Sequence, residues 1–148
     1  MEEVLTLASA CFFGHRDVPV DLDSVLMETI TDIVKNKGVT NFYVGNNGRF
    51  DDMVLHALKR VKQSFPNISY CVVLSYYPQN KLPFSLQHVK TVFPAEVAAV
   101  PKKVAIIRRN KWMIDHSEFV VSYVRRNFGG AASAVEYAKK KERTVISL

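Results

Sequence analysis

The sequence has little cysteine and lacks the patterns that mark metal-binding and membrane-spanning proteins. Its 148 residues contain two cysteines, Cys11 and Cys71, and their spacing matches no set of metal ligands. We expect both to be buried free thiols in a reducing cytoplasm, and we expect no metal site. No apolar run is long enough to cross a bilayer, so no membrane partner is expected.

Patterns typical of nucleic-acid-binding modules and of common nucleotide-binding loops are also missing. The net charge is +6, but the basic residues are scattered, with no arginine-rich arm, zinc-finger spacing or aromatic ribonucleoprotein motif. These absences argue against a nucleic-acid partner, whereas the charge suits a small anionic ligand. The glycines match neither the Rossmann G-x-G-x-x-G pattern nor the phosphate-binding loop G-x-x-x-x-G-K-[ST].

What the sequence does contain is an alternation of apolar runs with segments whose apolar residues recur at helical spacing. This alternation predicts an α/β fold, namely a three-layer, Rossmann-like, mainly parallel sheet of about five to six strands with helices on both faces. No repeat or linker divides the chain, so we expect residues 1–148 to form a single domain. The expected strands are Leu5–Phe13, Phe42–Val44, Ile68–Leu74, Phe119–Val124 and Thr144–Ile146. The expected helices run from an Asp23-Ser24 cap to Gly38, from Phe50 to Pro66, from Lys103 to His116, and from Gly129-Gly130 to Lys141.

The segment from Ser75 to Pro101 keeps no helical period, because prolines interrupt it repeatedly. We expect an irregular connection that carries a short strand around Thr91–Phe93. A functional lid and a variable loop are both compatible with this pattern.

Three glycine-bearing loops follow strands that we expect to be parallel. They are Gly14-His15-Arg16, Gly45-Asn46-Asn47-Gly48 and Phe128-Gly129-Gly130. Ligands bind beyond the carboxyl ends of parallel strands, and the three loops share that edge. Bare backbone N–H groups, a helix start after the glycine pair, and cationic and amide side chains suit a phosphate group. We therefore predict a small phosphorylated ligand, although a Gly-Gly pair at such a junction is often only a tight turn.

Single residues near these loops have both a functional and a structural interpretation. Arg16 either binds a phosphate or is a solvated loop arginine. His15 either contacts the ligand or forms a hydrogen bond within its own loop. Asp51, at a helix start, either caps that helix or binds a ribose hydroxyl.

Arg109 is unusual because it shares a helix face with Met113 and follows the apolar run Val104–Ile107. An arginine beside core residues must extend to solvent or find a partner. The candidate partners are a ligand phosphate and Glu136, although Glu136 can instead pair with lysines on its own helix.

Together these motifs resemble those of the SLOG superfamily, which is named for the DNA-processing protein DprA and the Lonely Guy enzymes. Within it, the sequence is similar to a short bacterial branch that includes YpsA-like proteins. The residues that carry the resemblance are Cys11–Arg16, Gly45–Asp51, Arg108–Ser117, Gly129-Gly130 and Tyr137-Ala138. The resemblance extends over the whole chain and implies a Rossmann-like fold that binds a nucleotide or a nucleotide-derived ligand, such as an ADP-ribose-like molecule, with no certain cofactor.

The sequence also departs from the motifs of this superfamily. Phe13 stands where a threonine usually precedes Gly-His-Arg, and Ala131 stands where a threonine usually follows Gly-Gly, so two phosphate-binding hydroxyls are absent. In the Lonely Guy enzymes, Arg-Lys-x-x-Met and Pro-Gly-Gly-x-Gly-Thr-x-x-Glu motifs carry phosphoribohydrolase activity. Their counterparts here are Arg109, Asn110 in place of lysine, Met113, Gly129, Gly130, Ser133 and Glu136. The resemblance thus implies Arg109 and Glu136 as a catalytic pair.

Three functions follow from the sequence. The first is a domain that binds or senses a nucleotide-derived ligand without turnover, and the second is an N-glycosidase acting on a nucleoside 5′-monophosphate. The third, by analogy with DprA, is nucleic-acid binding, which we rank last. The ligand-binding candidates are Gly14, His15, Arg16, Gly45, Asn46, Asn47, Asp51, Asn110, Gly129, Gly130 and Ser133. The sequence leaves open whether the chain is an enzyme and whether it forms a homo-oligomer.

Overall fold

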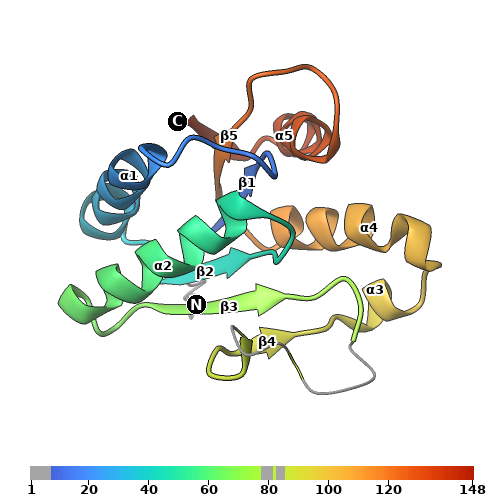
Figure 1. Cartoon of the computed structure of the whole chain (residues 1–148), viewed down its shortest axis with the longest axis horizontal. Helices are drawn as coiled ribbons and strands as arrows, with labels where there is room; N and C mark the ends of the chain where they lie inside the picture. The colour runs from blue at the N-terminus through green and yellow to red at the C-terminus, as the bar shows by residue number, and fades with distance from the viewer. Residues whose placement is uncertain (1–7, 78–81, 83–85) are drawn as a thin grey trace, which may run out of the picture.

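The computed structural model describes residues 8–77, 82 and 86–148, which form alternating strands and helices (Figure 1). In chain order the elements are β1 (Ser9–Gly14), α1 (Leu22–Lys37), β2 (Asn41–Val44), α2 (Arg49–Ser64), β3 (Ser69–Val73), β4 (Thr91–Val92), α3 (Ala95–Ala98), α4 (Lys102–Asp115), β5 (Phe119–Tyr123), α5 (Gly130–Lys140) and β6 (Thr144–Ser147). The predicted α/β class is confirmed.

Within the described residues, six strands form one parallel sheet in the order β4-β3-β2-β1-β5-β6. The chain adds strands on one side of β1 as far as β4 and then crosses back to place β5 on its other side. The strand order therefore reverses between β1 and β5, which is the topological switch point where ligands bind in folds of this kind. Because all strands run in the same direction, their carboxyl ends share one edge, as the β2 and β3 arrows show (Figure 1).

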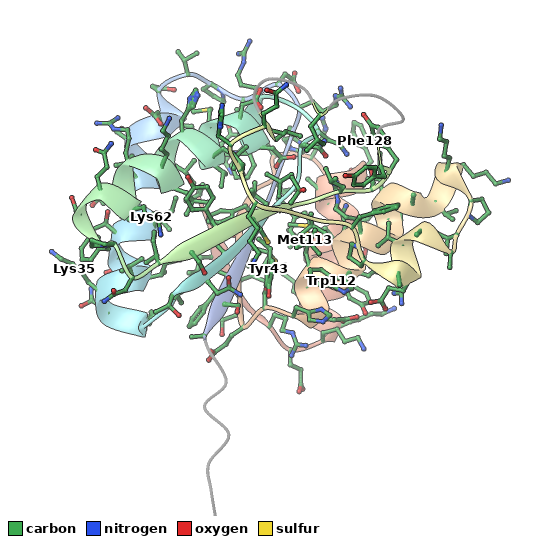
Figure 2. All side chains as sticks on the ribbon, turned by 90° about the horizontal axis from the view of Figure 1, so that it is seen from below. Lys35, Tyr43, Lys62, Trp112, Met113 and Phe128 are labelled. Carbon is green, nitrogen blue, oxygen red and sulfur yellow. The ribbon has the colours of Figure 1, made fainter. Side chains whose placement is uncertain are left out.

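The sheet is covered on both faces because its central strands are apolar at successive positions. Phe12 belongs to a core under α1 and α2, which includes Leu26, Ile30 and Val54. The next residue, Phe13, points to the opposite face and belongs to a second core with Met113 on α4 and with the buried side of α5. This alternation is the two-residue period of a strand. The side chains of the two faces are seen from below in Figure 2.

Several predicted boundaries change in the structure. The first strand begins at Ser9 rather than Leu5, and residues 5–7 lie outside the described ranges. The first helix begins at Leu22 after Asp21, and no side-chain hydrogen bond caps it, so the expected Asp23-Ser24 cap is wrong. Gly38 ends this helix as predicted, with a left-handed φ of 66°.

The segment between β3 and α4 is only partly described, but it contains more structure than we predicted. The expected short strand is present as β4, whereas the helix α3 was not predicted because Pro94 immediately precedes it. Pro94 is the N-cap of α3, and a proline is compatible with the start of a helix, where no backbone donor is needed. Residues 78–81 and 83–85 of the irregular connection, for which a lid and a variable loop were both considered, lie outside the described residues.

Two further predictions concern the cysteines and membranes. Cys11 and Cys71 are buried free thiols, as predicted, and burial raises the pKa of the Cys11 thiol to about 12. Cys11 therefore stays protonated and unreactive at neutral pH. None of the helices in the described ranges is long and apolar enough to cross a membrane.

Candidate functional site

A cleft of about 220 Å³ lies at the carboxyl edge of the sheet, at the switch point between β1 and β5. Its walls come from the loops after β1, β2 and β5, from the start of α2 and α5, and from α4. The lining residues are Phe12, Phe13, Gly14, His15, Arg16, Gly45, Asn47, Asp51, Ile106, Arg109, Asn110, Met113, Arg126, Gly129, Gly130 and Ala131. The three glycine-bearing loops therefore meet at one site.

Most of the predicted site residues line this cleft, although their roles in binding stay predictions. Gly14, His15, Arg16, Gly45, Asn47, Asp51, Arg109, Asn110, Gly129 and Gly130 are among the lining residues. Asn46 contacts the site through its Oδ1, which accepts a hydrogen bond from Nη1 of Arg109 at 3.4 Å. Ser133 and Glu136 are exposed on α5 and are not among the described residues that line the cleft.

Arg109 is buried in the wall of the cleft, with 3% of its surface exposed. Its Nε donates to Oδ1 of Asn110 at 3.1 Å, and its Nη1 donates to the carbonyl oxygen of Val73 at 3.4 Å. In the Asn47 amide orientation that satisfies both of its ends, Nη2 of Arg109 also donates to the side-chain oxygen of Asn47 at 3.1 Å. These bonds connect α4 to the ends of β2 and β3.

The carboxylate that faces Arg109 is Asp51, not Glu136. Nη1 of Arg109 and Oδ2 of Asp51 each lie 3.0 Å from the position that a Cβ would occupy at Gly45. Both side chains therefore approach the Gly45 backbone closely, and a larger residue there would push against them. Oδ2 of Asp51 also accepts the backbone N–H of Asn47 at 2.8 Å, which fixes the loop before α2. The sequence left a ligand phosphate and Glu136 as partners of Arg109, and Glu136 is not among its neighbours in the described residues, which include Asp51, Asn46, Asn110 and Val73.

Burial sets the electrostatics of this pair. Desolvation raises the pKa of Asp51, although the Asn47 hydrogen bond and the positive charge of Arg109 oppose the shift. Desolvation likewise lowers the pKa of Arg109, and Asp51 opposes that change. Each charge thus opposes the effect of desolvation on the other, and the hydrogen bonds of Arg109 hold it in the wall of the cleft.

His15 forms a hydrogen bond outside its own loop. Its Nε2 accepts the backbone N–H of Arg125 at 2.9 Å, which joins the loop after β1 to the loop after β5. A ring nitrogen that accepts an N–H carries no proton, so His15 is neutral in this arrangement. Burial lowers the pKa of His15, and the charges of Arg126 and Arg125 lower it further, against the effect of Asp17. The structure thus places His15 as a connector of two cleft loops.

The cations at the mouth of the cleft are Arg16 and Arg126. Arg126 is partly exposed and lies 3.9 Å from the carboxylate of Asp17, which is more exposed still. Such an ion pair at the surface is weak, so the guanidinium can turn toward a ligand at little cost. Sequence reasoning missed Arg126, even though it stands in the short loop between a predicted strand and the glycine pair.

The start of α5 supplies backbone donors. Gly129 is the N-cap residue with a φ of 96°, a conformation that favours glycine, and no side chain caps the helix. No acidic residue lies in the first turn, and a Cβ added at Gly129 or Gly130 would meet no atom within 4 Å. The first N–H groups of this helix are therefore not capped by a side chain, and they form the positive end of the helix dipole.

The residues that the structure describes do not contain a set of side chains that could bind a metal ion. In those residues, no group of three or more histidine, cysteine, aspartate and glutamate side chains is placed to hold an ion. The cleft instead combines guanidinium groups, the uncapped backbone N–H groups of α5 and the apolar side chains of Phe13 and Ile106. This combination suits an anionic group attached to a partly apolar body.

Comparisons with known proteins bear on the fold. No protein-family model matches the chain, and neither does any curated protein sequence. A solved structure of DNA processing protein A from Streptococcus pneumoniae is similar to this chain, with a TM-score of 0.71 and 13% identity. The match covers 95% of this chain and 50% of the S. pneumoniae chain. A second similar structure is that of DNA processing protein A from Helicobacter pylori, which was reported for its single-stranded DNA binding mode. It has a TM-score of 0.68 and 14% identity, and the match covers 96% of this chain and 65% of the H. pylori chain.

The chain has a DprA-like fold. It spans between one half and two thirds of the length of these two proteins. The expectation that a nucleic-acid partner is unlikely must be corrected, because a protein with this fold was studied for how it binds single-stranded DNA. That expectation rested on scattered basic residues and on the absence of nucleic-acid-binding motifs in the sequence.

Proposed function

We propose that this protein binds the phosphate-bearing part of a nucleotide in the cleft at the switch point, and that single-stranded DNA supplies it. The observation that carries this proposal is the meeting of Arg16 and Arg126 with the uncapped start of α5. Guanidinium groups and free helix N–H groups are the donors that bind phosphate oxygens. The DprA-like fold supports the choice of single-stranded DNA.

The size of the cleft limits the ligand. At about 220 Å³ it is smaller than the roughly 300–1,000 Å³ of sites that enclose whole drug-sized ligands. A single nucleotide unit, held with part of its surface in solvent, fits this volume better than an ADP-ribose-like molecule. A free mononucleotide, which is the ligand of the sensing function predicted from sequence, is the second candidate.

The geometry gives the N-glycosidase alternative less support. That reaction requires Glu136 near the ribose, but Glu136 is exposed on α5 and outside the lining of the cleft. Arg109 is held by Asn46, Asn110 and Val73 and faces Asp51. We therefore propose a binding protein without turnover. We further propose that residues 1–148 act as one cytoplasmic domain of the YpsA-like branch.

Fluorescence anisotropy with a fluorescein-labelled dT12 oligonucleotide tests the proposal. We expect binding that weakens with NaCl between 50 and 200 mM, as counterion release requires. The double substitution Arg16→Ala and Arg126→Ala should lower the affinity and reduce the slope of log K against log salt by about 1.4, since each phosphate contact on a single strand contributes roughly 0.7. A matched control removes Lys35 and Arg60, two exposed cations near the ends of α1 and α2.

The outcomes separate the candidate ligands. Binding of dT12 that depends on Arg16 and Arg126, and that dTMP displaces only at much higher concentration, supports single-stranded DNA. Equal displacement by dTMP and by unlabelled dT12, per mole of ligand, supports the mononucleotide alternative. If the control substitutions weaken binding as much as the cleft substitutions, the charge of the whole protein explains the affinity and the proposed site is wrong.

A further inference from the structure

Phe128 is a large apolar side chain that the fold leaves in solvent. It lies in the loop between β5 and α5, and 66% of its surface is exposed. Phenylalanine is among the residues most often buried, so this exposure calls for an explanation. Figure 2 shows Phe128 on the side of the molecule that carries Trp112 and α4, away from Lys35 and Lys62.

The surroundings of Phe128 indicate what kind of ligand could cover it. The guanidinium carbon of Arg126 lies 5.3 Å from the centre of the Phe128 ring, a distance typical of a cation–π contact. The next two residues, Gly129 and Gly130, begin the uncapped helix and line the cleft. An exposed aromatic ring therefore stands directly beside a cation and a set of backbone N–H donors.

A second apolar side chain borders the same cleft. Ile106 on α4 lines it and is 43% exposed, so its neighbourhood is not fully covered either. A ligand that matches this surface needs an anionic group for the helix start and a flat apolar group for the ring. A nucleotide has both parts, and successive bases of a single strand are free to stack because they are unpaired.

We propose that Phe128 is a stacking platform for a base of single-stranded DNA, an inference that rests on the proposed function of the cleft. The phosphate of the bound strand lies at the start of α5, and a neighbouring base lies on the Phe128 ring. Arg126 holds the ring in place and contributes positive charge to the same strand. Because every base has a flat face, the platform does not select a sequence.

The experiment pairs a change in the protein with a change in the ligand. Labelled dT12 is compared with an oligomer of the same length in which the bases are replaced by abasic tetrahydrofuran units. For dT12, Phe128→Ala should lower the affinity roughly fivefold to a hundredfold, the range measured for loss of one stacked base. For the abasic oligomer, Phe128→Ala should leave the affinity unchanged, because the phosphates are still bound.

Two further variants keep the test sharp. Phe128→Trp retains a ring and should bind dT12 as well as the wild-type protein does. Val25→Ala removes an exposed apolar side chain on α1 and serves as the matched control, with no expected effect on either oligomer. Circular dichroism checks that each variant keeps its fold.

The results distinguish the inference from the proposed function on which it rests. If the wild-type protein binds neither oligomer, the proposed function is wrong, and the platform is wrong with it. If the wild-type protein binds dT12 through Arg16 and Arg126 but Phe128→Ala has no effect, the platform alone is overturned. The platform is also overturned if Phe128→Ala weakens both oligomers equally, since the side chain then supports the loop rather than a base.

Discussion

The hydrogen bond between His15 and the backbone N–H of Arg125 gives the cleft a dependence on pH that can be measured. The bond joins the loop after β1 to the loop that carries Arg126 and leads into α5, at an N···N distance of 2.9 Å. Protonation of Nε2 would set two N–H groups against each other and place a third positive charge beside Arg125 and Arg126. The two loops would then lose their connection.

The burial of this contact sets how much stability the protein loses when His15 is replaced. His15 is 7% exposed, and its ring also makes an edge contact with Tyr123 at 6.2 Å between ring centres. His15→Ala leaves the Arg125 N–H without its acceptor. We expect a loss of about 1 to 2 kcal/mol of unfolding free energy, which is less than for a fully buried N–H because Arg125 is exposed. For a chain of 148 residues this corresponds to a fall in Tm of about 2 to 8 °C.

The sign of the pH effect is fixed by the direction of the pKa shift. The pKa of His15 in the folded protein lies below its ordinary value of 6.5, chiefly because of burial. Below pH 6.5 the unfolded chain therefore binds a proton that the folded protein does not yet accept. The contribution of neutral His15 to stability is complete above pH 6.5 and is lost as the pH falls toward the lowered pKa of the folded state.

Urea unfolding between pH 5 and pH 8 measures this effect in wild type, His15→Ala and His15→Gln. Glutamine keeps an oxygen that can accept the Arg125 N–H but does not titrate. We expect His15→Gln to be nearly as stable as wild type at pH 7.5 and to show a smaller loss of unfolding free energy below pH 6.5. If both proteins lose stability with the same slope, His15 does not titrate as the structure requires.

The same substitutions decide between the ligand-binding role predicted for His15 and the loop-connecting role that its hydrogen bond to Arg125 indicates. If the histidine binds the ligand as a cation, the affinity for dT12 should rise as the pH falls from 7.5 to 5.5. If the histidine instead holds the two loops together, the affinity should fall over this range in wild type and change less in His15→Gln. A rise in wild type that His15→Gln abolishes would refute the role of His15 as a connector of the loops.

Two further predictions concern the walls of the cleft. Gly14→Ala should lower the free energy of unfolding in urea by about 1 to 3 kcal/mol, because a Cβ there would lie 2.3 Å from the buried ring of Phe50. Gly130→Ala is the control and should change stability little, since a Cβ there would meet open space. Equal effects of the two substitutions would contradict this packing. Arg109→Met should destabilise the protein by about 1 to 3 kcal/mol, because buried acceptors on Asn110 and Val73 lose their donor and Asp51 loses a nearby positive charge, and adding Asp51→Asn should restore part of the loss. If the double variant is no more stable than Arg109→Met, the two charges are not coupled.

Much of the architecture is already determined by the order of apolar and polar residues. Apolar runs separated by helical periods predicted a parallel sheet, and parallel strands place the loops that follow them at one edge. The glycine loops after β1, β2 and β5 therefore had to come together, and they do. The shared face of Arg109 and Met113 was also predicted from their spacing, and both side chains are buried.

The sequence did not indicate which surface of a helix would be covered. Val104 and Ile107 belong to an apolar run, yet both are exposed, while the polar pair Arg109 and Asn110 is buried. An apolar residue is covered only if another element lies over it, and α4 reaches the sheet mainly through its second half, where Met113 and Ile114 join the core. Side-chain polarity alone cannot supply that information.

The partners of the charged and titratable side chains were decided by the tertiary structure. Arg109 faces Asp51 at the start of α2 rather than Glu136 on α5, and His15 bonds to an amide 110 residues further along the chain. The sequence determines which charged and polar side chains are present and, through strand direction, which loops share an edge of the sheet. Hydrogen bonds and ion pairs act over a few ångströms, so the partner of each group depends on helix rotation and loop path, which are set only when the whole core is packed.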